Sequence, residues 1–120
     1  MHKKLQAWWL SGLTIGVLAA ATGAADAVDV PTSWQDNGTT GTYSSGAPTI
    51  RVTVGNATTT ATRLSAAGTW AHKAEQFCND DSYRQGPWRG GVGSSAYSTT
   101  DTCGSSAGGT DLGRGWFRLP

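Results

Sequence analysis

Charged residues are scarce in this sequence. Only 14% of its 120 residues are charged, whereas 17 are glycine. Coiled coils and long-helix bundles are rich in charged, helix-forming residues, so this composition excludes them. Nine Lys and Arg residues are balanced by eight Asp and Glu residues, which leaves a formal net charge of +1. The balance excludes a basic nucleic-acid footprint or an acidic tail as the basis of function, and we expect no nucleic-acid partner.

Hydrophobic runs are lacking as well, except near the start of the chain. Lys3 and Lys4 precede an interrupted apolar run over residues 5–21, and Ala25 and Ala27 are small residues of the kind that a signal peptidase accepts. This layout predicts a signal peptide over residues 1–27, cleaved after Ala27 or, as second choice, after Ala25. An uncleaved anchor is the alternative, but a run of about 17 residues is at the lower limit for spanning a membrane. The protein is expected to be secreted, or periplasmic in a bacterium, with no stable membrane span after cleavage.

The sequence contains only two cysteines, Cys78 and Cys103. They are 25 residues apart, with no CxxC motif and no neighbouring histidine, which makes a zinc site a poor interpretation. A catalytic thiol would have to stay free and activated, whereas disulfides persist outside the cell. We predict a Cys78–Cys103 disulfide, with metal binding and thiol catalysis as the alternatives.

Aliphatic residues are few, so the predicted core is thin. Residues 28–46 are rich in Thr, Ser and Gly and are interpreted as a flexible leader, followed by one small domain over 47–120. Residues 49–54 alternate strictly between polar and apolar side chains, which predicts a half-buried strand. Gly55-Asn56 is a candidate two-residue turn, and residues 57–64 would return as the second strand of a hairpin.

A short helix is expected next. Trp70, Ala74, Phe77 and Cys78 are placed at helical spacing within residues 69–78. The remainder of the chain is turn-rich, with strand-like pieces only at 94–99 and 116–119. The predicted fold is therefore a small β-rich (α+β) domain with a β-hairpin, one short helix and an irregular, glycine-rich C-terminal half that carries one disulfide.

Catalytic and metal-binding signals are weak. On the predicted helix His72 and Glu75 would share one face, as an acid/base pair requires, but a solvated helix face explains the same pattern and the HExxH motif is absent. Residues 79–82, with Asp101 and Asp111, could offer oxygen ligands to calcium, but Asp and Asn are also the ordinary residues of turns. We expect no catalytic residues, no metal and no cofactor.

Aromatic and basic residues gather around the two cysteines. Aromatic rings beside Arg side chains suit the binding of sugars or protein surfaces, because rings supply stacking area and guanidinium groups supply fixed donors. The same tryptophans could instead form the core, with Arg stems lying over them. The candidate ligand-binding residues are Tyr83, Arg84, Trp88, Arg89, Trp116 and Arg118.

Two Asn-x-Thr triplets begin at Asn37 and Asn56. In a eukaryotic host both asparagines would be glycosylation acceptors on surface loops. A threonine-rich chain also produces such triplets by chance.

One part of the chain resembles a known family. Cys78, Trp88-Arg89, Cys103 and the segment Gly115-Trp116-Phe117-Arg118 follow one another as in the eight-cysteine domain of uromodulin-type extracellular glycoproteins. The resemblance covers residues 78–118 and includes two of the eight cysteines. It implies an extracellular, disulfide-linked module that acts in adhesion or recognition.

The sequence thus predicts a secreted, non-catalytic binding or adhesion module, with an extracellular protein or glycan as its partner. A small antimicrobial or toxin-like protein and a fragment of a secreted hydrolase are the alternatives. The near-neutral charge disfavours the first, and a single histidine outside the signal region disfavours the second.

Overall fold

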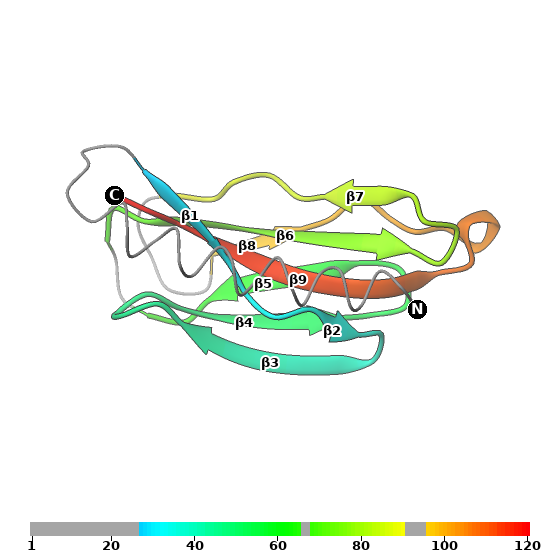
Figure 1. Ribbon diagram of the computed structural model, residues 1–120, viewed down its shortest axis with the longest axis horizontal. Helices are drawn as coiled ribbons and strands as arrows, with labels where there is room; N and C mark the ends of the chain where they lie inside the picture. The colour runs from blue at the N-terminus through cyan, green and yellow to red at the C-terminus, as the bar shows by residue number, and fades with distance from the viewer. Residues whose placement is uncertain (1–26, 66–67, 91–95) are drawn as a thin grey trace.

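Two antiparallel β-sheets stack face to face in the computed structural model, which describes residues 27–65, 68–90 and 96–120 (Figure 1). Sheet A has the order β1-β9-β6-β7, with β2 also paired to β9, and sheet B has the order β3-β4-β5-β8. Sheet A contains β1 (Val28–Pro31), β2 (Gln35–Asp36), β6 (Ala71–Cys78), β7 (Tyr83–Gln85) and β9 (Thr110–Leu119). Sheet B contains β3 (Thr39–Ser44), β4 (Thr49–Val54), β5 (Thr59–Arg63) and β8 (Tyr97–Thr99).

The predicted hairpin is present as β4 and β5. Ile50, Val52 and Val54 are buried, and the residues between them face outward, as the alternation requires. The predicted two-residue turn is wrong, because the loop contains four residues. The Gly55 N–H donates to the Thr58 carbonyl at 2.8 Å, and Gly55 does not adopt the positive φ that a type II′ turn needs.

The predicted short helix is also wrong, because its residues form the central strand β6. Gln76 and His72 are fully buried between the sheets together with Ala74, whereas Lys73 lies on the opposite face of the strand. In a strand, inward apolar residues normally recur at every second position. Here some inward positions carry polar side chains, so this pattern is lost, and the remaining apolar residues match the spacing of a helix. In the described residues the only helical segment is the 3-10 turn Ser105–Ala107.

The C-terminal half is more regular than expected, because β9 is the longest strand and pairs with β1, β2 and β6. Two glycines occupy its inward positions. A Cβ atom on Gly113 would lie 2.2 Å from Thr59 Oγ1, and one on Gly115 would lie 2.7 Å from Ile50 Cδ1. The absence of these side chains allows β9 to approach sheet B closely.

The stretch predicted as a flexible leader, residues 28–46, forms three strands instead. β1 and β2 pair with β9 in sheet A, and β3 pairs with β4 in sheet B. A scarcity of apolar residues predicts a flexible segment, but strands at the edge of a sheet need to bury only one face, and hydroxyl-rich residues suit the exposed face of a pleated sheet. Apart from Ala27, the predicted signal peptide lies outside the described residues.

The core lies between the two sheets. Its largest cluster contains Val30, Ile50, Val52, Val54, Ala61, Trp70, Ala74 and Phe117. A charged side chain is buried beside it, since the Arg63 guanidinium lies 3.9 Å from the centre of the Trp70 ring. Among the described residues no helix is long and apolar enough to cross a membrane.

Candidate functional site on the outer face of sheet A

The outer face of sheet A brings together five aromatic and three basic side chains from distant parts of the chain. Inward glycines on β9 alternate with outward Arg and Trp residues, and pairing places these beside the outward residues of β6. In this register Arg114 lies opposite Glu75, and Trp116 lies opposite Lys73. We name this surface the aromatic-arginine face: Asp29, Trp34, Lys73, Glu75, Phe77, Tyr83, Trp88, Arg114, Trp116 and Arg118.

Arg114 is at the centre of this face. Its guanidinium carbon lies 4.1 Å from the ring centre of Trp34 and 4.7 Å from that of Trp116, so two tryptophans flank one cation. Arg114 Nε also donates to Glu75 Oε1 in an ion pair whose side chains are only 7% and 6% exposed. A buried charge needs such a partner, so the pair fixes the guanidinium between the two rings.

Aromatic contacts extend the face on the Trp34 side. The Trp34 and Phe77 ring centres are 5.4 Å apart, and Phe77 meets the Tyr83 ring edge-on at 5.5 Å. The Tyr83 hydroxyl donates to Glu75 Oε2, so the Glu75 carboxylate accepts one hydrogen bond from Tyr83 and one, at Oε1, from Arg114. Burial and the neighbouring Glu75 carboxylate raise the pKa of Tyr83 above its ordinary value, which favours the protonated hydroxyl that donates to Glu75.

A second cation–aromatic contact lies at the other end of the face. Arg118 makes a bidentate ion pair with Asp29, with N–O distances of 2.7 and 2.9 Å. Its guanidinium lies 3.9 Å from the Trp88 ring centre, and the Lys73 ammonium lies 4.9 Å from the same ring. Fork-to-fork pairing holds the Arg118 plane in one orientation, which keeps the indole of Trp88 against the sheet.

Three hydrogen-bond donors of the face are buried without a partner in the described part of the chain: Trp34 Nε1, Trp116 Nε1 and Arg114 Nη1. The three belong to the rings and the guanidinium that contact one another at the centre of the face. An unsatisfied buried donor costs about 1–3 kcal/mol. Such a cost is unusual in a native protein and marks a place where acceptor atoms of a ligand would be stabilising.

The structure brings four of the six predicted ligand-binding residues together, namely Tyr83, Trp88, Trp116 and Arg118. The other two lie elsewhere. Arg84 pairs with the inward-facing Gln76, and its Nε donates to the Thr102 carbonyl at 3.2 Å. Arg89 forms an isolated bridge with His72, which also points inward.

Sequence reasoning missed Trp34, Arg114 and Glu75. Trp34 lay within the predicted leader, and Glu75 lay on the predicted helix. The signal that could have found Arg114 is the pattern Arg-Gly-Trp-Phe-Arg over residues 114–118, which alternates Arg and Trp with small or apolar residues as a strand requires. In β6 His72 faces inward and Glu75 outward, so the two do not form the acid/base pair that helical spacing suggested.

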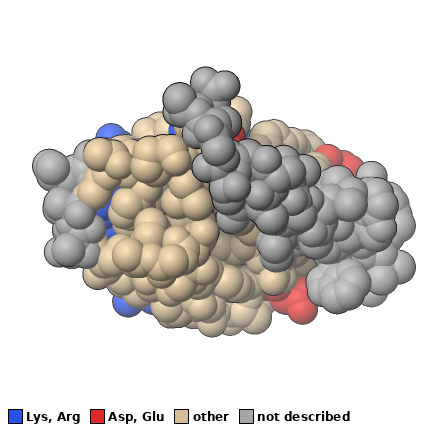
Figure 2. Space-filling model, turned by 60° about the vertical axis from the view of Figure 1, so that its left-hand side comes forward, with Lys and Arg blue, Asp and Glu red and all other residues tan. Residues whose placement is uncertain are grey.

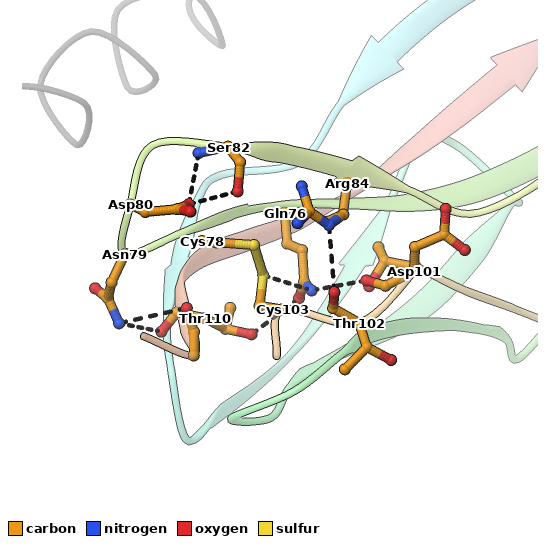
Figure 3. Close-up of a disulfide and its surroundings, with 12 residues drawn as sticks. Gln76, Cys78, Asn79, Asp80, Ser82, Arg84, Asp101, Thr102, Cys103 and Thr110 are labelled. Atoms are coloured by element: carbon orange, nitrogen blue, oxygen red, sulfur yellow. Dashed lines mark hydrogen bonds between the residues drawn. A yellow bond between two sulfur atoms is a disulfide. The ribbon is translucent and has the colours of Figure 1, made fainter. Parts of the chain in front are cut away.

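The predicted disulfide joins Cys78 to Cys103, with Cα atoms 5.4 Å apart. It connects the end of β6 to the segment before the 3-10 turn (Figure 3). Gln76 is fully buried next to it, and its amide nitrogen donates to the carbonyls of Ala57 and Asp101 and to Cys103 Sγ. The disulfide and this amide together tie three loops to one end of the sandwich.

The candidate calcium ligands behave as turn residues. Asp80 accepts hydrogen bonds from the backbone N–H and the hydroxyl of Ser82, and these bonds lower the pKa of its carboxyl group. Asn79 Nδ2 donates to the Gly108 carbonyl at 2.7 Å. Within the described ranges no three His, Cys, Asp or Glu side chains cluster as metal ligands.

Both predicted glycosylation asparagines are exposed and lie side by side in neighbouring loops. Asn37 Nδ2 donates to Asn56 Oδ1 and to the Thr110 carbonyl, each at 3.1 Å. The nitrogen that would carry a glycan on Asn37 is therefore engaged in the fold. Whether either triplet is used stays a prediction.

In comparisons with known proteins, no family model, no curated protein and no solved structure matches this chain. The resemblance of residues 78–118 to the eight-cysteine domain of uromodulin-type glycoproteins stays a prediction.

Proposed function

We propose that this chain is a secreted, non-catalytic binding module that takes an uncharged glycan on the aromatic-arginine face. The observation that carries the proposal is the group of three unpartnered donors on Trp34, Arg114 and Trp116. Sugars combine apolar ring faces, which stack on aromatic rings, with hydroxyl oxygens that accept hydrogen bonds. A sugar hydroxyl placed beside the Arg114 guanidinium and the indole N–H groups would accept hydrogen bonds from these donors, while the sugar ring stacks on a neighbouring indole.

The charge of the face favours an uncharged ligand. The guanidinium groups of Arg114 and Arg118 are already paired with the carboxylates of Glu75 and Asp29. In the view of Figure 2 the described surface is mostly uncharged (tan), with the visible Lys and Arg atoms toward the left and the Asp and Glu atoms toward the right. An anionic glycan would therefore find little net attraction.

The disulfide supports the secreted part of the proposal, since such bonds persist in oxidising compartments. No contact among the described residues favours the toxin-like or the hydrolase alternative. A catalytic histidine would have to reach its substrate, whereas His72 is fully buried between the sheets.

Binding to an array of neutral oligosaccharides tests this function, with affinity then measured by tryptophan fluorescence. Trp116→Ala removes one ring and one unpartnered donor, so we expect it to weaken binding about tenfold to a hundredfold, as loss of a stacked aromatic contact does. The matched control is Tyr97→Ala, which removes an aromatic ring that is 58% exposed on sheet B. The control should bind as the wild type does.

Two results would contradict the proposal. One is unchanged binding by Trp116→Ala, and the other is an equal loss in both variants. Near-ultraviolet circular dichroism establishes that each variant retains its packed core, so that a loss of affinity is not a loss of fold.

A further inference from the structure

The strand β3 lies at an open edge of sheet B. Among the strands of the described residues it pairs with β4 alone, and its six residues, Thr39–Ser44, include no proline and no charged residue. Natural sheets protect such edges because unpaired backbone groups are a template for another strand. We propose that β3 is a self-association edge, where it pairs antiparallel with β3 of a second copy of this chain. The paired sheets B would form one continuous sheet.

The direction of the backbone groups in β3 follows from the ladder. Ser45 N–H donates to the Pro48 carbonyl at 2.9 Å, and the Tyr43–Ile50 pair comes next in the register. Because antiparallel pairs alternate along the strand, odd-numbered residues of β3 direct their N–H and C=O groups toward β4. Even-numbered residues direct theirs away from the sheet. Thr40, Thr42 and Ser44 therefore present three N–H and three C=O groups at the edge.

The opposite edge of the sandwich is closed. The segment after β7 lies against β8, where Ser98 Oγ donates to the Pro87 carbonyl at 2.6 Å and Asp101 N–H donates to the Gln85 carbonyl at 3.4 Å. A Cβ atom on Gly86 would lie only 2.6 Å from the Thr99 carbonyl oxygen, so no further strand fits there. In sheet A, β1 and β7 have four and three residues, and β1 ends at Pro31. β3 is the longest open edge in the described chain.

The chemistry of β3 suits a second copy of itself. A twofold axis at Thr42 would place Thr42 opposite Thr42 of the second copy and Thr40 opposite its Ser44, with backbone bonds at each of the three pairs. Pairs of hydroxyl-bearing side chains across strands are favourable. Arg51 lies beside Thr42 on β4 and carries a charge. The two Arg51 residues would be three strand spacings apart, about 14 Å, which exceeds the screening length of about 8 Å at physiological salt.

Sedimentation equilibrium of the purified full-length chain tests this edge, over about 5 to 500 μM, since dimerisation follows mass action. Thr42→Pro removes an N–H that the isolated sandwich does not use, so we expect the fold to persist and dimerisation to weaken at least about tenfold. Thr42→Lys places two like charges face to face at the axis and should have the same effect. The control Thr42→Val keeps the backbone donor and should dimerise as the wild type does.

A concentration-dependent dimer that both Thr42→Pro and Thr42→Lys weaken supports the proposal. A wild type that remains monomeric at the highest concentration overturns it. So does a dimer that neither variant weakens, because that dimer would use another surface. The Lys variant keeps the test decisive if the Pro variant does not fold.

Discussion

Gly113 and Gly115 occupy inward positions of β9, where a strand of a sandwich ordinarily carries a side chain. Gly113→Ala would place a Cβ atom 2.2 Å from Thr59 Oγ1 and 2.9 Å from Val54 Cγ2. Both neighbours are buried, so the sheets must separate locally, and we expect a loss of about 1–3 kcal/mol in the free energy of unfolding. Urea denaturation measures it. The control is Gly104→Ala, where a Cβ atom meets nothing within 4 Å. Equal midpoints for the two variants would contradict this packing argument.

His72 gives the fold a pH dependence. Burial and the nearby Arg63 charge lower its pKa from the ordinary value of 6.5. Well above pH 6.5 the imidazole is neutral in both the folded and the unfolded state, so His72 does not reduce the free energy of unfolding. Below pH 6.5 the unfolded chain binds the proton first, and stability falls as the pH drops toward the lower pKa of the folded protein.

The slope below pH 6.5 is expected to reach at most about 1.4 kcal/mol per pH unit for this one group. Urea denaturation between about pH 7.5 and pH 5 measures it, since most carboxyl groups titrate lower. The variant His72→Gln lacks the titrating group, so its stability should stay nearly constant over this interval. A parallel decline in the variant would assign the effect to other groups.

At the scale of elements, the sequence predicts strands well only where the inward side chains are aliphatic. β4 shows this, because Ile50, Val52 and Val54 mark its buried face. In β6 the inward positions include His72 and Gln76, and the Gln76 amide takes its hydrogen-bond partners from distant segments. Thr59 Oγ1 donates to Gln76 Oε1 at 2.8 Å, for example. A pattern of hydrophobicity cannot reveal a buried polar residue whose partner lies on another sheet.

The candidate site could be predicted only in part, because some of its contacts also join residues that are distant in the sequence. Trp88, Trp116 and Arg118 stand out as residue types suited to recognition, and they do share a face. The ion pair between Glu75 and Arg114 joins strands that are 39 residues apart in the sequence, so only the pairing of β6 with β9 reveals it. The residue types therefore indicated a surface suited to binding, whereas the strand pairing determined which of these residues lie together on it.

At the scale of the whole molecule, the two proposals concern opposite sheets and can be tested separately. Antiparallel pairing of identical strands places the twofold axis perpendicular to the joined sheet B. Both copies of sheet A would then lie on the same side of it, with their aromatic-arginine faces turned the same way. Two sites that face one surface raise the apparent affinity for a repetitive ligand without any new contact. A dimer could therefore attach firmly to a repetitive polymer even if each aromatic-arginine face binds a single repeat weakly.

We expect the stability of the whole sandwich to depend on the disulfide, because the aliphatic core is small. Cys78 and Cys103 close a loop across 25 positions of the chain. In the chain-entropy model this closure stabilises the folded state by about 3.5 kcal/mol, a large share of the 5–15 kcal/mol typical of a domain. The double variant Cys78→Ser/Cys103→Ser should therefore unfold at a much lower urea concentration than the oxidised wild type.

The reduced wild type is the matched control, because it keeps both sulfur atoms but opens the loop. We expect it to unfold near the midpoint of the double variant, since both lack the same constraint on the unfolded chain. A double variant as stable as the oxidised protein would show that the two sheets hold together without the bridge. If only the region around Gln76 loosens, hydrogen exchange will show fast exchange near the ends of β5 and β6 and slow exchange in β4. That pattern would limit the role of the disulfide to one end of the sandwich.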